Sequence, residues 1–266
     1  MSTMARTADG GAGEEGQRAE QPFLTQLSDL LRMELTNWRW SWRSLLITAT
    51  LSPLVSVLGL GVFARDSGPE ALLYVLTGNV VISLMFGNLG NVESHFTFMR
   101  ARGALDYMAT LPIRREALIL AVVLAFLLMP LPSLVVTIGV GSAILGVPVR
   151  PHPLLALVVP LSVASLASVG ALIGVAVRTP EEGGSLALLF ALLMAALGPV
   201  VVPPDRLPAA LVAVGRLSPA TYAASALRQT LVGPVTGRIA LDLGVLAVVT
   251  GVLLALVARR MDWRQA

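Results

Sequence analysis

Long uncharged stretches dominate the pattern of polar and apolar positions along this chain. Five of them are long enough for the roughly 20 apolar residues that cross the core of a lipid bilayer, and they cover residues 44–64, 71–92, 117–149, 151–177 and 183–204. A further apolar run, 239–258, contains only Asp242 near its beginning. The pattern predicts an all-α membrane protein with six transmembrane helices.

The boundaries of these segments follow from where charged and turn-forming residues interrupt the apolar runs. We place a six-span transmembrane domain at 44–260, with its spans at residues 45–63, 71–91, 117–141, 154–177, 185–202 and 239–258. Residues 1–21 lack apolar periodicity, which predicts a disordered cytoplasmic tail. Between 22 and 43, leucine and then tryptophan recur every three or four residues, a pattern typical of an amphipathic interfacial helix. Alternatively, this segment is the beginning of the first span.

The segment before the last span differs from the others. Residues 203–237 are moderately apolar but contain Asp205, Arg206, Arg216 and Arg228. A membrane crossing here would bury a charge at considerable cost. We therefore predict re-entrant helices that dip into one leaflet from the extracellular side.

Composition narrows the class of protein further. Only 13% of the 266 residues are charged, about half the share in a soluble domain, so a water-soluble globule is excluded. All 19 positively charged residues are arginine, and without lysine the chain cannot form the phosphate-binding loop G-x-x-x-x-G-K-[ST]. Any energy from ATP must therefore come from another subunit.

The arginines also predict the orientation of the chain in the membrane. They lie between the spans and form no single patch, so no nucleic-acid partner is expected. Six spans place both termini on one side, and the loops on that side are richer in arginine. By the positive-inside rule, both termini are cytoplasmic.

Candidate catalytic residues are few. The chain has no cysteine and only two histidines, His95 and His152, which the topology places on opposite sides of the membrane. The sequence therefore offers no group of residues that could form a catalytic serine–histidine pair or a metal site. The centres of spans one to five lack ionisable residues, which disfavours an ion-coupled carrier.

The charged loop 93–116 is the most informative segment. Bulky apolar and charged residues alternate there at near-helical spacing, Gly103 interrupts the pattern, and Pro112 ends it. One interpretation is a positively charged loop that only sets topology. The other is a short helix that presents Phe, Met, Tyr and Arg to a soluble partner.

The order of these parts resembles the permease subunit of an ABC-2-type bacterial ABC transporter, a family that includes drug-resistance exporters. Two motifs contribute to the resemblance, which covers about residues 22–260. They are Glu93…Arg102-Gly103…Leu105…Ala109-Thr110-Leu111-Pro112-Ile113-Arg114 and Leu217-Ser218-Pro219-Ala220-Thr221-Tyr222…Leu227-Arg228. By this resemblance, the first contains the helix that couples to a separate ATPase, and the second, with Pro219, Tyr222 and Arg228, forms the extracellular re-entrant helices.

The resemblance also implies partners and roles. The ATPase-coupling residues would be Glu93, Phe96, Phe98, Arg100, Arg102, Gly103, Asp106, Tyr107 and Leu111. This chain would bind no cofactor, because ATP and Mg²⁺ belong to the ABC ATPase subunit. It would act in the bacterial inner membrane as a dimer with a second permease copy, identical or different.

A transport path would run along spans two and five at the dimer interface. Its candidate residues are Asn79, Ser83, Asn88, Leu193 and Met194, which suit a hydrophobic, drug-like or lipid- or glycan-linked substrate. Small residues in span four, from Ser162 to Gly174, favour close packing within the chain over a dimer seam. The alternatives are an integral-membrane enzyme acting on lipid or peptide, and a membrane scaffold or immunity-type protein.

Overall fold

The computed structural model describes residues 22–37, 42–64, 68–111 and 113–261, and this part of the chain is helical with no strand. The predicted all-α fold is therefore confirmed for these residues. The elements are α1 (Phe23–Asn37), α2 (Trp42–Ala64), α3 (Pro69–Leu84), η3 (Met85–Leu89), α4 (Gly90–Ala101), α5 (Ala104–Thr110), α6 (Arg115–Leu128), α7 (Leu131–Leu145), α8 (Leu155–Ala176), α9 (Pro180–Ala196), η4 (Pro204–Arg206), α10 (Ala209–Gly215), α11 (Pro219–Leu231) and α12 (Arg238–Arg260).

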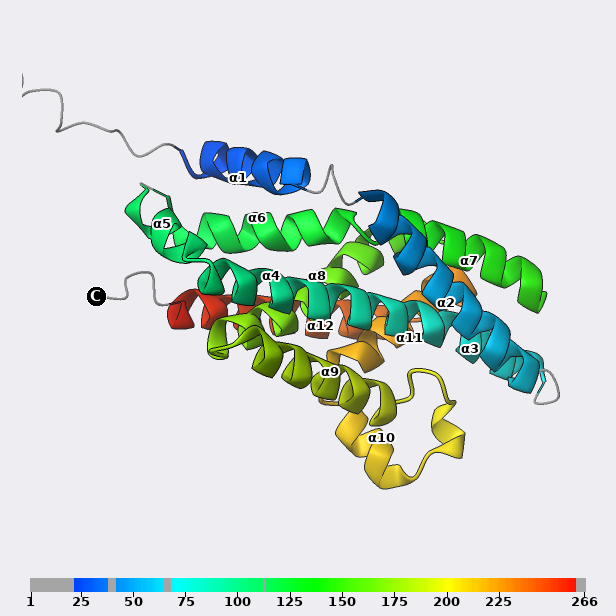
Figure 1. Cartoon of the computed structure of the whole chain (residues 1–266). Helices are drawn as coiled ribbons and strands as arrows, with labels where there is room; N and C mark the ends of the chain where they lie inside the picture. The colour runs from blue at the N-terminus through cyan, green and yellow to red at the C-terminus, as the bar shows by residue number, and fades with distance from the viewer. Residues whose placement is uncertain (1–21, 38–41, 65–67, 112, 262–266) are drawn as a thin grey trace, which may run out of the picture.

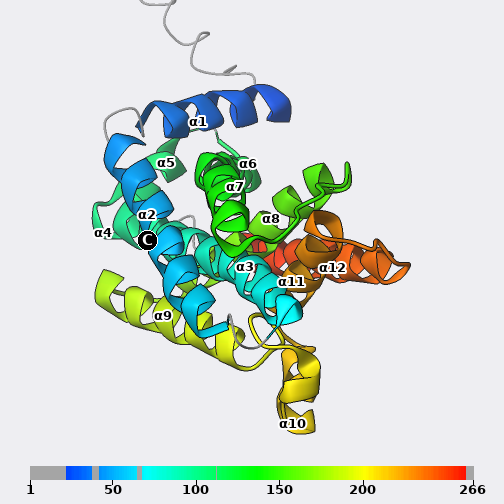
Figure 2. The ribbon, with the colours of Figure 1, turned by 90° about the vertical axis from the view of Figure 1, so that its right-hand side faces the viewer.

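Most of these helices run lengthwise through an elongated body (Figure 1). One end of the body carries α5, the turn between α8 and α9, and the end of α12; we call it the α5 end. The opposite end carries the end of α2, the beginning of α3 and α10; we call it the α10 end. Figure 2 shows that α10 projects from the body and that α1 lies on the outside of the body.

Four helical runs among the described residues are long and apolar enough to cross a membrane. They are Pro69–Ala101, Arg115–Leu145, Leu155–Ala176 and Arg238–Arg260. They correspond to the predicted spans two, three, four and six. The predicted spans one and five coincide with α2 and α9, which are not among the four, so the count of six stays a prediction.

The helix α1 is amphipathic, as predicted, and covers Phe23–Asn37 of the predicted segment 22–43. The last two residues of that segment, Trp42 and Arg43, belong to α2. Leu30 is buried against the body, with Leu27 and Leu31 packed beside it, whereas Leu24 and Leu35 are exposed. The predicted tail 1–21 and the tryptophans at 38 and 40 lie outside the described residues.

The second predicted span continues further than expected. The elements α3, η3 and α4 form one run of 33 residues, Pro69–Ala101, whereas the prediction ended the span at Asn91. A π-helical segment, Met85–Leu89, lies in the middle of this run. The first nine residues of the predicted loop 93–116 are therefore helical, and only the part after Gly103 changes direction.

Proline explains the break in the third predicted span. Helix α6 ends at Leu128 and α7 begins at Leu131, with Pro130 at the N-cap of α7. Proline has no N–H to donate and its ring clashes with the preceding turn. The two helices still count together as one candidate membrane crossing, Arg115–Leu145.

The helix α8 occupies the centre of the body and packs against α4, α6, α9, α11 and α12. Its small residues permit close approach: a Cβ atom on Gly170 would lie 2.2 Å from the Leu89 carbonyl oxygen, and one on Gly174 would lie 2.7 Å from that of Glu93. Ser162, Ser165 and Ser168 are also buried. The small-residue stripe therefore packs within the chain, and that interpretation is confirmed.

Candidate functional site

At the α5 end, the long helix α3–α4 leads into the short helix α5 through Gly103. This glycine has a φ of 69°, in the left-handed region where a side chain is strained. The break turns the chain away from the axis of α4, so that α5 lies beyond the end of the long helix (Figure 1).

The exposed residues at this turn form what we call the knee surface: Phe98, Arg102, Asp106 and Tyr107. Phe98 and Tyr107 are 45% and 64% exposed, and the guanidinium carbon of Arg102 lies 5.5 Å from the centre of the Phe98 ring. Large exposed aromatic side chains beside arginine are characteristic of interaction surfaces. Four of the nine predicted coupling residues are therefore exposed at this turn.

Two other predicted coupling residues are buried. Glu93 is 2% exposed and Phe96 is 0% exposed. The Glu93 carboxylate accepts a hydrogen bond from the Thr97 hydroxyl and lies against Gly183, where a Cβ atom would come within 1.9 Å of Glu93 Oε1. Both side chains serve the packing of α4 against α8 and α9, and in this structure neither is available to a partner.

Arg100 joins the end of α4 to the end of α8. Its guanidinium donates hydrogen bonds to the carbonyl oxygens of Val175 and Val177. These carbonyls are at the C-terminus of α8, where a helix has unsatisfied acceptors and partial negative charge. Arg100 is thus a link within the chain, while Leu111, the last predicted coupling residue, is half-buried after α5.

The helix α1 is attached to the same end of the body. Nε2 of His95 lies 3.3 Å from Oε1 of Glu34, and Gln26 Oε1 accepts a hydrogen bond from the backbone N–H of Arg114. Leu30 shares an apolar cluster with Leu105 of α5 and with residues of α6 and α12. A displacement of α5 would therefore also displace α1, α6 and α12, because these helices share its apolar cluster.

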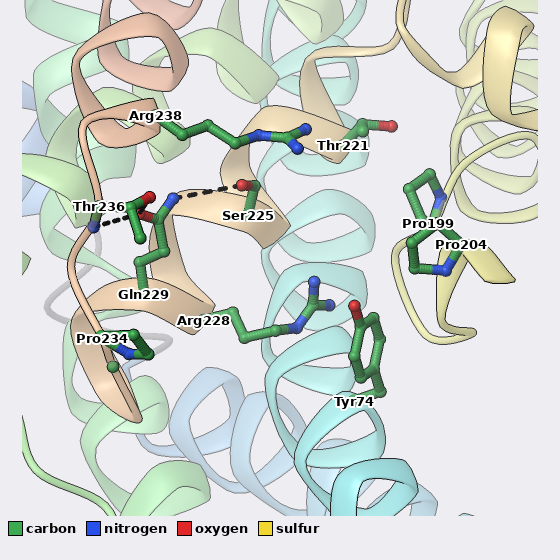
Figure 3. Close-up of a pocket in the computed structure, with 11 residues that line it drawn as sticks. Tyr74, Pro199, Pro204, Thr221, Ser225, Arg228, Gln229, Pro234, Thr236 and Arg238 are labelled. Carbon is green, nitrogen blue, oxygen red and sulfur yellow. Dashed lines mark hydrogen bonds between the residues drawn. The ribbon is translucent and has the colours of Figure 1, made fainter.

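At the α10 end, a cavity of about 290 Å³ opens between α3, α11 and the beginning of α12. Its polar lining comes mainly from α11 and the residues that follow it (Figure 3). The lining residues are Tyr74, Pro199, Pro204, Thr221, Ser225, Arg228, Gln229, Gly233, Pro234, Thr236 and Arg238. Arg228, predicted as part of a re-entrant segment, is the innermost charge.

The direct contacts of the Arg228 guanidinium are with neutral groups. Its guanidinium carbon lies 3.6 Å from the centre of the Tyr74 ring, Nε donates to the Thr77 hydroxyl at 3.3 Å, and Nη2 donates to the Val200 carbonyl at 3.0 Å. Burial lowers the pKa of Arg228, the Tyr74 contact opposes that shift, and the charge of Arg238 adds to it. Among the described residues, no carboxylate forms an ion pair with Arg228.

The other two residues predicted for the re-entrant segment have structural roles. Pro219 is buried at the first turn of α11, where its missing N–H costs nothing. The Tyr222 hydroxyl donates to the Arg216 carbonyl at 2.8 Å and so joins α11 to the end of α10. The segment 203–237 contains η4, α10 and α11, and its re-entrant position stays a prediction.

The residues proposed for the transport path do not converge on this cavity. Asn79 is buried and donates to the Pro53 carbonyl at 2.8 Å, which joins α3 to α2. Asn88 and Ser83 bond to carbonyls of their own helical run. Leu193 is exposed on α9, and Met194 packs into the core. Their assignment to a path stays a prediction.

Some residues of these sites were missed by sequence reasoning. Tyr74 and Arg238 lie near span ends, where aromatic and basic residues are common, and Thr77 is a single polar residue within span two, so nothing in their pattern marked them. Likewise, only the fold brings Glu34 and Gln26 to their partners and places Thr221 in the lining of the cavity. The sequence placed His95 only on one side of the membrane, and the structure packs it against Phe96 and Phe126.

The fold defines a polytopic helical membrane protein, and no cluster of His, Asp or Glu able to hold a metal occurs in the described residues. The family model for the ABC-2 type transporter matches residues 25–232. The chain belongs to the ABC-2 type transporter family, whose domain forms the permease component of an ABC transporter. The search of curated proteins gave no match.

Proposed function

We propose that this chain is the membrane subunit of an ATP-driven exporter, and that it docks its ATPase through the knee surface. Support comes from one observation above all: Phe98, in the last turn of the candidate membrane-crossing run Pro69–Ala101, and Arg102, Asp106 and Tyr107, just beyond that run, are all exposed. An apolar and charged surface of this kind suits a protein partner in water. ATP and Mg²⁺ would bind only to that partner.

The packing at the α5 end supplies a route for mechanical coupling. The α3–α4 run is continuous from the knee surface into the body, and Arg100 ties its end to α8. Closure of two ATPase subunits would move the knee surface of each permease copy. Because α8 lies in close contact with η3 at Gly170 and with α4 at Gly174, these helices would shift as rigid elements.

A second copy and the membrane would cover the apolar outer faces. On α2, the side chains of Ile47, Leu51, Val55, Leu58 and Val62 form one exposed stripe. Similar apolar side chains are exposed on α9 and α12. A path between two such copies would be apolar, so we propose a hydrophobic, drug-like or lipid- or glycan-linked substrate, exported from the inner membrane of a bacterium.

The docking proposal is tested by co-purification. The chain is expressed with an ATPase that carries the G-x-x-x-x-G-K-[ST] loop, and the ATPase retained on the tagged permease is measured. We expect Arg102→Glu combined with Asp106→Arg to reduce retention about tenfold or more, because both charges would then oppose their partners. Arg216→Glu, an exposed change at the α10 end, is the matched control and should retain the ATPase fully.

The outcomes separate docking from folding. Membrane insertion and detergent-solubilised yield should be equal for both variants, since all three side chains are exposed. Unchanged retention in the Arg102→Glu, Asp106→Arg variant would refute the knee surface as the docking site. ATP-dependent uptake of a lipophilic dye into inverted vesicles, present with the wild-type pair and absent with the variant, would support transport.

A further inference from the structure

The cavity at the α10 end contains more positive charge than its own residues neutralise. Arg228 contacts only neutral partners. Arg238 has one ion-pair partner, Asp242, at 3.8 Å between Nε and Oδ1. That distance is too long for a hydrogen bond, and the Arg238 side chain is 63% exposed. Two guanidinium groups thus face a cavity that contains no carboxylate among its lining residues.

The donors of these residues are only partly used. An arginine has five N–H donors, and Arg228 uses one at Nε and one at Nη2 within the chain. Figure 3 shows the guanidinium groups of Arg228, from α11, and Arg238, from α12, both extending toward the side of the cavity where Pro199 and Pro204 lie. The two side chains thus approach the same side of the cavity from two helices.

Hydroxyl groups add to this arrangement. Thr221 lines the cavity and is 6% exposed, and its Oγ1 has no hydrogen-bond partner in the structure. A buried hydroxyl without a partner costs free energy unless a ligand or water satisfies it. Ser225 also lines the cavity; it accepts a long hydrogen bond, 3.4 Å, from Gln229 Nε2, and its hydroxyl hydrogen-bonds to the Asp242 carboxylate.

The remaining polar residues hold the site in shape. Gln229 Nε2 donates to Asp242 at 3.0 Å, and Gln229 Oε1 accepts from the backbone N–H and the hydroxyl of Thr236 at 3.0 and 2.8 Å. These bonds join α11 to the segment before α12. The buried Asp242 is directed toward Gln229 and Arg238, so it supports the wall of the cavity and leaves the cations facing inward.

From this geometry we infer that the cavity binds an anionic phosphate group, with Arg228, Arg238 and Thr221 as its ligands. Arginine pairs with phosphate through charge-assisted, often bidentate hydrogen bonds. The volume of about 290 Å³ is at the small end of ligand pockets, which suits a headgroup and excludes a whole lipid. Such a phosphate comes from an anionic phospholipid or from a free solute, and the inference does not rest on an ATPase partner.

Binding is tested on the full chain without nucleotide or ATPase, by the midpoint of its thermal unfolding. In one arm the detergent-solubilised protein is titrated with sodium phosphate against sodium chloride of equal ionic strength. In the other, nanodiscs of phosphatidylcholine alone are compared with nanodiscs containing phosphatidylglycerol. A higher midpoint with phosphate supports a free anion, and a higher midpoint only with phosphatidylglycerol supports a lipid headgroup.

The variants assign the effect to the cavity. We expect Arg238→Gln to weaken binding about tenfold or more, the effect of one lost charge-assisted hydrogen bond, while Arg216→Gln, exposed at the same end and outside the lining, should behave as wild type. Arg228→Gln should abolish binding. If Arg228→Gln proves unstable, Arg238→Gln alone tests the inference. No response to either ligand, or an equal response in Arg238→Gln, would overturn the inference.

Discussion

At the residue scale, a few glycines decide how closely the helices approach one another. Gly78, Gly170, Gly174 and Gly183 each lie where a Cβ atom would come within 2.7 Å of an atom from another part of the chain, which real Cβ atoms do not do. Three of these contacts are with backbone atoms, and the fourth is with the Glu93 carboxylate. The sequence shows the glycines but not which of them are at contacts, because that depends on how the helices are rotated.

Gly170 offers the sharpest test of this packing. In Gly170→Ala, the new methyl group would lie 2.2 Å from the Leu89 carbonyl oxygen, so α8 or η3 must move. We expect a loss of about 1–3 kcal/mol in the free energy of unfolding, the usual cost of overpacking, seen as a lower midpoint of thermal unfolding in detergent. Gly251→Ala in α12 is the control, because no atom lies within 4 Å of its Cβ position. Equal midpoints for the two variants would contradict the close contact.

At the element scale, hydrophobic patterning located every long helix but not the end of the second span. Glu93, His95 and Thr97 make the segment after Asn91 look like a polar loop in the sequence. In the structure, their polar groups lie against α1, α9 and the helix itself, so α4 continues to Ala101. These partners come from helices distant in sequence, and no local pattern contains them. The same reason applies to α1, whose contacts with α4 and α6 were not predicted.

The contact between α1 and α4 can be measured by a double-mutant cycle. Glu34 and His95 lie 3.3 Å apart, with the Glu34 side chain 2% exposed. Because one partner is buried, we expect Glu34→Ala and His95→Ala to be coupled by about 0.5–3 kcal/mol in unfolding free energy. Arg115 and Glu116 are the matched control, since their atoms are also 3.3 Å apart but both side chains are exposed. That cycle should give at most about 1 kcal/mol. Additive effects for Glu34 and His95 would show that α1 is held by its apolar face alone.

At the scale of the whole molecule, the two ends of the body differ in chemistry. The α5 end carries the knee surface, α1 and the two arginines that end α12. The α10 end carries the cavity, whose lining joins Tyr74 of α3 to Arg228 of α11 and Arg238 of α12. Because these residues are far apart in the sequence, the cavity could not be predicted. The residues of the knee surface all lie within one short segment, so the sequence could indicate them.

Orientation in the membrane connects both sites to function. If the α5 end is cytoplasmic, the knee surface would be on the side of the proposed ATPase partner, and the cavity proposed to bind phosphate would face the outer leaflet. The chain has no cysteine, so one introduced thiol reports one position. Thr110, after the knee, and Ala213, on α10, are both exposed and suit replacement by cysteine.

Labelling of intact cells with a membrane-impermeant maleimide gives the result directly. We expect Ala213→Cys to react in intact cells, and Thr110→Cys to react only after the membrane is opened, because arginine-rich loops are retained in the cytoplasm. Prior blocking of each thiol with a permeant maleimide, which should abolish both signals, shows that the label is on the introduced cysteine. Reaction of Thr110→Cys in intact cells would place the knee surface outside, where no ATP-hydrolysing partner could reach it. The coupling proposal would then fail. Phosphate binding at the α10 end would still be open to its own test.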